Sequence, residues 1–174
     1  NLKVEPKDKI ALVGNIGSGK STLVKLIVGL QSEYTGTILI NGKDITTLNI
    51  DKLRNYISYI PQHPKLFDRT LFENITYGME DAKYTETDIY QILESVKLHD
   101  IAEKFKKMMH QKVGKNGSHL SGGQRQIVWL LRSLLKDNRM IILDEPTSSL
   151  DEVNKLNIIT VVEELSKERN IILI

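Results

Sequence analysis

The sequence contains no cysteine, which excludes disulfide scaffolds, zinc sites built from thiolates and thiol-based catalysis. It also lacks the run of about 18 consecutive apolar residues that a membrane-spanning helix needs. Its first residues, NLKVEPKDK, have no apolar centre of the kind that a secretory signal peptide carries. The sequence also has little excess of charge of either sign, because 24 Lys and Arg against 22 Asp and Glu leave a net charge of +2. That balance creates no large field that would favour nucleic acid or anionic lipid.

The composition is that of an ordinary globular domain. The chain has 174 residues, of which 40% are hydrophobic and 26% are charged, and this predicts a single domain over residues 1–174. The first residue is not Met, and residues 171–174 form an apolar run with no cap after it. We therefore expect a segment of a longer protein, truncated at both ends.

The order of apolar patterns predicts an α/β fold. Runs typical of strands occur at 9–13, 36–40, 56–60, 140–143 and 171–174. Helical spacing of apolar residues occurs at 21–30, 85–98 and 121–135. Strands separated by helices favour a mostly parallel sheet, and the hairpin signal Asn41-Gly42 adds a small antiparallel patch.

Residues 14–21 read GNIGSGKS, which fits the phosphate-loop pattern of two spaced glycines followed by Lys and a hydroxyl residue. The glycines let backbone N–H groups turn toward phosphate oxygens, and the following helix adds its positive dipole end. Lys20 supplies a charge for the β and γ phosphates, Ser21 an oxygen for Mg²⁺, and Thr22 a further phosphate donor. The alternative is a glycine-rich turn that binds nothing. It is disfavoured because a strand is expected before the motif and a helix after it.

Two acids follow the strand expected at 140–143. Ligands of open α/β sheets bind at the carboxyl ends of strands, where Asp144 and Glu145 would lie. Asp144 is placed to hold the metal ion through water, and Glu145 to polarise the attacking water as general base. A solvated strand end is the alternative interpretation of this pair taken alone.

The segment Leu120–Gln124 reads LSGGQ and is placed at the start of a helix. Ser121 and Gln124 have the spacing of a capping box, and a capped helix start is an anion-binding end. A purely structural cap is the alternative. It explains Ser121 and Gln124, but not Gly122 and Gly123, which weaken a helix start.

GNIGSGKS, LSGGQ, IILDEP and Ser149-Leu150-Asp151, in that order, resemble the nucleotide-binding domain of ATP-binding cassette (ABC) transporters. Residues 66–78, LFDRTLFENITYG, are similar to the exporter class. The resemblance implies a P-loop NTPase core with an inserted α-helical subdomain, roughly 66–135, that carries the signature LSGGQ. It also implies a head-to-tail dimer in which the signature of one domain covers the ATP held by the other.

Further roles follow from the resemblance alone. Gln62 falls at the Q-loop glutamine, which touches Mg²⁺ and water, and Asp151 at the D-loop aspartate, which bridges the dimer. The sequence departs from the family pattern at Lys115, where exporters usually have an acid, and at Trp129 and Leu131, where small residues are common.

The predicted site has three parts. The catalytic residues are Glu145, Gln62 and Lys20, and the metal-binding residues are Ser21, Gln62 and Asp144. The predicted nucleotide-binding residues are Gly14, Asn15, Gly17, Ser18, Gly19, Lys20, Ser21, Thr22, Ser121, Gly122, Gly123, Gln124 and Asp151.

The sequence thus predicts an ATP hydrolase with ATP and Mg²⁺ as cofactors, working on the cytoplasmic face of a membrane. Its expected partners are a second nucleotide-binding domain and a separate transmembrane domain through which substrate is transported, with no nucleic acid. The alternatives are a soluble ABC ATPase that acts on nucleic acid or ribosomes, and a regulator that binds nucleotide without hydrolysing it.

Overall fold

The computed structural model describes residues 2–15, 17–79, 84–136, 138–148 and 150–174. Ile16 of the phosphate loop and Ser149 of the Ser149-Leu150-Asp151 motif lie outside these described residues. The strands are β1 (Lys9–Ala11), β2 (Leu39–Ile40), β3 (Lys43–Asp44), β4 (Ile57–Ile60), β5 (Met140–Leu143) and β6 (Asn170–Leu173). The α-helices are α1 (Lys20–Ile27), α2 (Ile50–Tyr56), α3 (Leu71–Ile75), α4 (Glu86–Ser95), α5 (His99–Met108), α6 (Gly122–Leu135) and α7 (Glu152–Leu165). Single 3₁₀ turns occur at Ile45–Thr47 and Lys115–Gly117.

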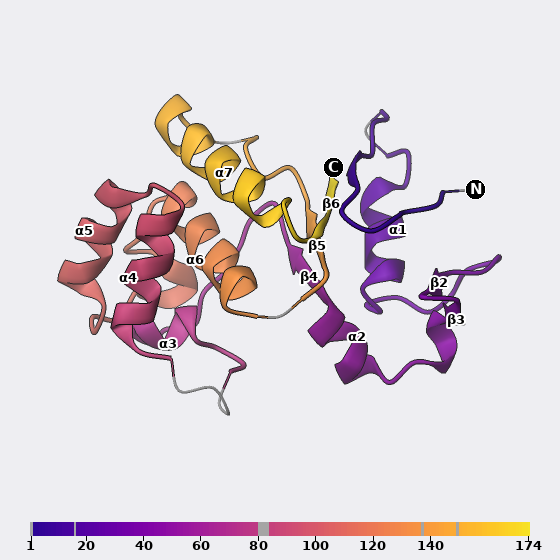
Figure 1. Cartoon of the computed structure of the whole chain (residues 1–174), viewed down its shortest axis with the longest axis horizontal. Helices are drawn as coiled ribbons and strands as arrows, with labels where there is room; N and C mark the ends of the chain where they lie inside the picture. Colours follow the sequence, from indigo (N-terminus) through magenta and orange to yellow (C-terminus); the bar gives the residue numbers. More distant parts are fainter. Residues whose placement is uncertain (1, 16, 80–83, 137, 149) are drawn as a thin grey trace.

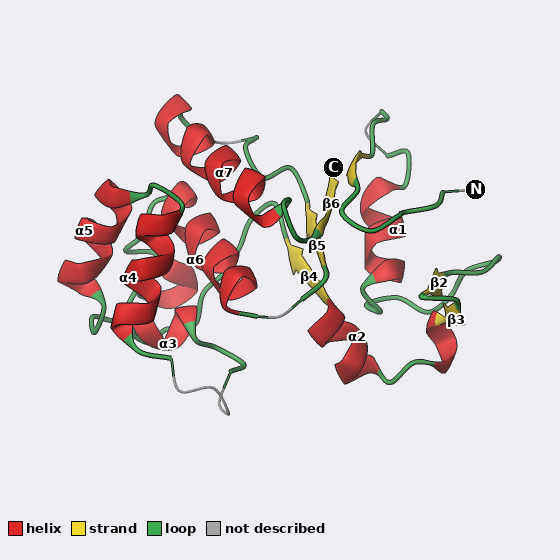
Figure 2. Ribbon diagram, in the orientation of Figure 1, coloured by secondary structure: helices red, strands yellow, loops and turns green. Residues whose placement is uncertain are grey.

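The main sheet is parallel and has the strand order β1-β6-β5-β4. Because all four strands run the same way, their carboxyl ends meet at one edge, from which the loops after β1, β4 and β5 leave. The separate pair β2–β3 is antiparallel and turns at Asn41-Gly42. The predicted parallel sheet and antiparallel patch are therefore both confirmed (Figure 2).

The two faces of the sheet contribute to different hydrophobic clusters, as the alternation of side chains along a strand requires. Ile141 and Leu143 of β5 belong to a large cluster with the helices α3 to α7. Ile142, between them, belongs to a smaller cluster with Val24 of α1 and Leu53 of α2. Figure 1 shows α1 and the β2–β3 pair on one side of β4–β6, and α3 to α6 on the other.

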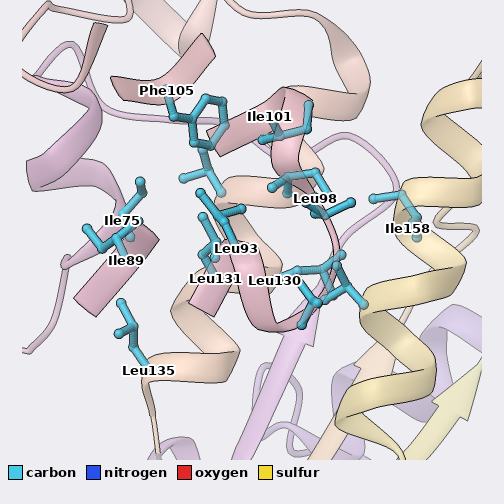
Figure 3. Close-up of a cluster of buried hydrophobic side chains, with 14 of the residues drawn as sticks. Ile75, Ile89, Leu93, Leu98, Ile101, Phe105, Leu130, Leu131, Leu135 and Ile158 are labelled. Carbon is cyan, nitrogen blue, oxygen red and sulfur yellow. The ribbon is translucent and has the colours of Figure 1, made fainter. Parts of the chain in front are cut away.

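The large cluster is the main core of the molecule. It brings together side chains from α3 to α7, including Phe105 and Leu93, both without exposed surface (Figure 3). Capping boxes start three of its helices, at Thr70, Thr85 and Ser121. The box formed by Ser121 and Gln124 was predicted from the sequence and is confirmed. No helix among the described residues is long and apolar enough to cross a membrane.

Two elements differ from the sequence prediction. The helix predicted over 21–30 from its apolar residues is α1, which ends at Ile27 and in which only Val24 is buried, because one face alone packs with residues of β5 and β6. Tyr56, expected to start a strand, is the last residue of α2, and β4 begins at Ile57. The change from helix to strand occurs without an intervening loop.

Candidate functional site

The phosphate loop connects β1 to α1 and lies at the surface. Gly17 and Gly19 have φ angles of +80° and +88°, which residues with side chains rarely adopt. Gly19 is the N-cap of α1, and no side chain caps this helix. The first N–H groups of α1 thus lack a side-chain acceptor, so an anion placed there would satisfy them. Exposed residues of the predicted phosphate site include Gly14, Asn15, Ser18, Ser21 and Thr22.

Lys20 folds back over the loop from the first turn of α1. Its Nζ donates hydrogen bonds to the carbonyl oxygens of Gly14, at 2.7 Å, and Asn15, at 3.1 Å. Both acceptors are neutral, so the ammonium charge stays uncompensated by these bonds. The loop therefore holds a cation beside an uncapped helix start, which is an arrangement suited to phosphate.

The two acids lie directly after β5, between the ends of its neighbouring strands. The backbone N–H of Asp144 donates to the carbonyl of Ile60, and that of Glu145 to the carbonyl of Ile174, each at 3.0 Å. Glu145 is exposed and has a φ of +43°, an angle that residues other than glycine seldom adopt. Such backbone conformations gather at functional sites, and nothing in the sequence signals this one.

Gln62 lies two residues beyond β4 and reaches the same place. Its Nε2 donates to Glu145 Oε2 at 2.5 Å and to Ser148 Oγ at 3.3 Å. The structure thus brings together two of the predicted catalytic residues, Gln62 and Glu145. Ser148 was not predicted, although it belongs to the same loop as the acids and its Oγ also donates to the carbonyl of Glu145.

Asp144 has a partner that sequence reasoning missed. The hydroxyl of Tyr59 on β4 donates to Asp144 Oδ2 at 3.0 Å. Burial first, and then the hydrogen bond to Asp144, raise the pKa of Tyr59 to about 12, so this hydroxyl keeps its proton at neutral pH. The sequence placed Tyr59 on a strand but gave no signal that its hydroxyl reaches a carboxylate.

The donor set at this edge fits Mg²⁺. Ser21 offers a hydroxyl, Gln62 an amide oxygen and Asp144 a carboxylate, which are the hard oxygen ligands that this ion takes. Among the described residues there is no group of three or more His, Cys, Asp or Glu that could hold a metal ion. The site therefore suits an ion that takes most of its ligands from phosphates and water, as Mg²⁺ does with nucleotides.

The signature segment Leu120–Gln124 lies at the start of α6, away from the phosphate loop. Ser121 is exposed, its Oγ accepts from the Gln124 N–H at 3.2 Å, and Gln124 Oε1 accepts from the Ser121 N–H at 2.9 Å. Figure 1 shows α6 and α1 on opposite sides of the sheet. One chain therefore does not bring these two predicted parts of the nucleotide site together.

At the starts of α6 and α7, Gly123 and Asp151 both lie against Asn154. A Cβ atom added to Gly123 would lie 2.4 Å from Oδ1 of Asn154, so this glycine has a packing reason within the chain. Asp151 caps α7: its Oδ1 accepts from the Asn154 N–H at 3.0 Å and its Oδ2 from Asn154 Nδ2 at 2.6 Å. These two bonds lower the pKa of Asp151. Asp151 thus has a structural role that the sequence did not indicate.

A cavity of about 420 Å³ opens beside β4, and we call it the groove. Its aromatic walls are Tyr59, Phe67, Tyr77 and Trp129. Its charged lining residues are Arg54, Lys65, Arg132 and Lys136. None of its described lining residues is acidic. The groove therefore combines an apolar surface with an excess of positive charge.

Comparison with known proteins identifies the family. The family model described as ABC transporter matches residues 1–148, and the chain belongs to this family. It is 38% identical, over all 174 residues, to the ATP-dependent lipid A-core flippase of Neisseria meningitidis, and it covers 28% of that protein. It is 36% identical over 174 residues to the mitochondrial iron-sulfur clusters transporter ABCB7 of Danio rerio, of which it covers 23%.

The fold is similar to that of a solved exporter. A bacterial Atm1-family ABC exporter with ATP bound matches 96% of this chain at a TM-score of 0.84 and 30% identity. The chain covers 29% of that structure, so it spans less than a third of the relatives compared. The P-loop NTPase fold predicted from the sequence is confirmed. These relatives are named as a flippase, a transporter and an exporter, which does not favour the alternative of an ABC ATPase acting on nucleic acid or ribosomes.

Proposed function

We propose that this chain binds and hydrolyses Mg-ATP and thereby drives an exporter. The observation that carries the proposal is the hydrogen-bonded pair Gln62 and Glu145, which lies with Asp144 at the edge of the parallel sheet from which the phosphate loop also leaves. Lys20 and the start of α1 bind the phosphates, and Glu145 accepts the proton of the attacking water. Ser21, Gln62 and Asp144 would hold Mg²⁺, which would supply positive charge to neutralise charge on the phosphates.

A second nucleotide-binding domain completes the site. The signature residues Ser121 to Gln124 lie at the exposed start of α6, far around the sheet from the phosphate loop. This separation supports a head-to-tail dimer in which that helix start covers the nucleotide held by the partner. Asp151 is the N-cap of α7, and we assign it to the same dimer interface.

A transmembrane domain is the second partner, and the groove is where we place it. The groove is apolar and cationic, so it fits an acidic, partly apolar segment of the membrane protein. Its wall is formed by β4, which leads directly to Gln62. This arrangement supports a location on the cytoplasmic face of the membrane. The gathering of α3 to α6 around one cluster supports treating residues 66–135 as a helical subdomain that forms the other wall.

The substitution Glu145→Gln in the intact protein tests the hydrolytic role. It removes the proton acceptor and keeps the shape of the side chain, so turnover should fall by about 10²–10⁴ while ATP binding persists. Glu163→Gln, at an exposed position on α7, is the matched control and should leave turnover unchanged. Unaltered hydrolysis in Glu145→Gln would show that this residue is not the proton acceptor.

The substitution Lys20→Ala tests the phosphate site, because it removes the ammonium group. Retained micromolar ATP affinity in this variant would show that Lys20 does not bind the phosphates.

A further inference from the structure

Tyr59 is in contact with two features of the molecule at once. Side chains two residues apart on a strand share a face, so Tyr59 lies on the same side of the sheet as Ile57, among the apolar residues of the smaller cluster. Tyr59 also lines the groove, as do Leu53 and Ile57 of the same cluster. Its hydroxyl, at the other end of the side chain, donates to Asp144 Oδ2. One side chain therefore spans the distance between the groove and the acid expected to hold the metal ion.

The hydrogen bond from Tyr59 orients one carboxylate oxygen of Asp144 and leaves the other available to bind a metal ion. Oδ2 accepts from Tyr59, and none of the described residues donates to Oδ1. A carboxylate that would otherwise rotate freely is thus presented in one orientation toward the edge where the phosphate loop ends. The carboxylate of the next residue, Glu145, is also oriented by a hydrogen bond to one of its oxygens, which Gln62 donates. Strand β4 and its loop accordingly position both acids.

We propose that Tyr59 is a positioning residue that holds Asp144 ready for Mg²⁺ and makes that position sensitive to what fills the groove. The inference rests on the proposed function and adds a route by which the membrane partner affects the nucleotide site. A partner segment that enters the groove contacts the Tyr59 ring, and any shift of the ring moves the hydroxyl that orients Asp144. The link needs no motion of the sheet, because the two contacts belong to one side chain.

Tyr59→Phe in the intact protein tests the positioning role, because it removes the hydroxyl and keeps the ring. ATP binding is measured by calorimetry, first in EDTA and then over a series of Mg²⁺ concentrations. Metal-free affinity should stay at the parental value, while the Mg²⁺ concentration for half-maximal enhancement of binding should rise roughly three- to tenfold. A change confined to the metal-dependent part is not expected from a general loss of stability.

Tyr56→Phe is the matched control. Tyr56 is also half-buried against the smaller cluster. Its hydroxyl accepts a hydrogen bond from Asn41 Nδ2 at 3.3 Å, whereas the hydroxyl of Tyr59 donates to Asp144. Tyr56→Phe should leave the Mg²⁺ dependence unchanged. Equal curves for Tyr59→Phe, Tyr56→Phe and the parent would overturn the positioning role. Absence of any Mg²⁺-dependent ATP binding in the parent would instead contradict the proposed function.

A double-mutant cycle tests the link to the groove. Tyr77→Ala removes an aromatic ring from the groove wall and is 41% exposed in the parent, so its loss leaves the core intact. If Tyr59 transmits the state of the groove, Tyr77→Ala should shift the Mg²⁺ dependence in the parent and have a smaller effect in Tyr59→Phe. An equal shift in both backgrounds, or no shift in the parent, would overturn the link.

Discussion

Arg132 is the residue on which the contact between α3 and α6 depends. It is 8% exposed, and its Nε and Nη2 donate to the carbonyl and to Oδ1 of Asn74, which has no exposed surface. The guanidinium also lies 5.6 Å from the ring centre of Tyr77 and 4.9 Å from that of Trp129. Burial lowers the pKa of Arg132 to about 10, so the side chain still carries its charge at neutral pH.

Arg132→Met should destabilise the protein by about 2–3 kcal/mol, because the buried carbonyl of Asn74 loses a charged donor and two aromatic rings lose a cation. Arg132→Lys should recover part of this loss, since an ammonium keeps the charge but cannot form the same paired contact. The measurement is the midpoint of thermal unfolding. Arg54→Met, at an exposed cation of the same groove, is the control. Equal midpoints for Arg132→Met and Arg54→Met would contradict the role of Arg132.

At this scale the sequence predicts residues that form contiguous motifs and misses pairs formed across strands. GNIGSGKS and the acids after β5 are readable because spacing along the chain determines their chemistry. The contact of Tyr59 with Asp144 depends on the register in which β4 pairs with β5, with Ile60 opposite Leu143. No single-sequence pattern encodes that register. The left-handed backbone of Glu145 is unpredictable for a similar reason, because its N–H bonds across the sheet to the carbonyl of Ile174.

The helices α6 and α7 pack closely at their starting turns. Gly123 is buried, and the side chain of Asn154 fills the space that a Cβ would need. Gly122, one residue earlier, has Leu150 Cδ2 at 3.5 Å from the position of an added Cβ, which is an ordinary contact. Packing within the chain therefore requires glycine at position 123 but leaves space for a Cβ at position 122.

This difference predicts opposite effects of the same substitution. Gly123→Ala should cost about 1–3 kcal/mol of stability, because Asn154 or the whole of α7 must move. Gly122→Ala should be neutral or stabilise by up to roughly 1 kcal/mol, since alanine favours a helix. Thermal unfolding of both variants checks the order. If Gly122→Ala proved the more destabilising of the two, the packing account of Gly123 would be wrong.

The elements that the sequence failed to predict have identifiable causes. Helix α7 contains Ile158, Ile159, Val161 and Val162, and β-branched residues in a row favour a strand on local propensity. It is helical because Asp151 caps it and because Ile158 and Val161 pack into the core. Helix α5 begins at His99 without a side-chain cap, so no sequence signal marks its start. Tertiary packing decides both cases.

For the whole molecule, the main consequence of the fold is that the two helix starts proposed to bind the nucleotide belong to different faces. The start of α1 carries the phosphate loop, and the start of α6 carries Ser121, on the other side of the sheet. A single chain can therefore hold a nucleotide from one side only. Symmetric pairing of two such molecules provides both missing halves together, and it does so at two equivalent places.

This pairing predicts that two inactive variants restore one another. Lys20→Ala disables the phosphate loop, and Gly122→Asp sets a negative charge at the signature helix start, where the space for a Cβ is available. When the two are co-expressed with different tags, half of the dimers should be mixed, and each mixed dimer has one intact site of two. The rate of phosphate release should then recover to about a quarter of the parental value, given closed two-fold symmetry.

Lys20→Ala mixed with Ser21→Ala is the control and should not recover, because every site then contains an altered phosphate loop. A rate for the first mixture as low as that of the control would mean that the signature acts on the nucleotide of its own chain.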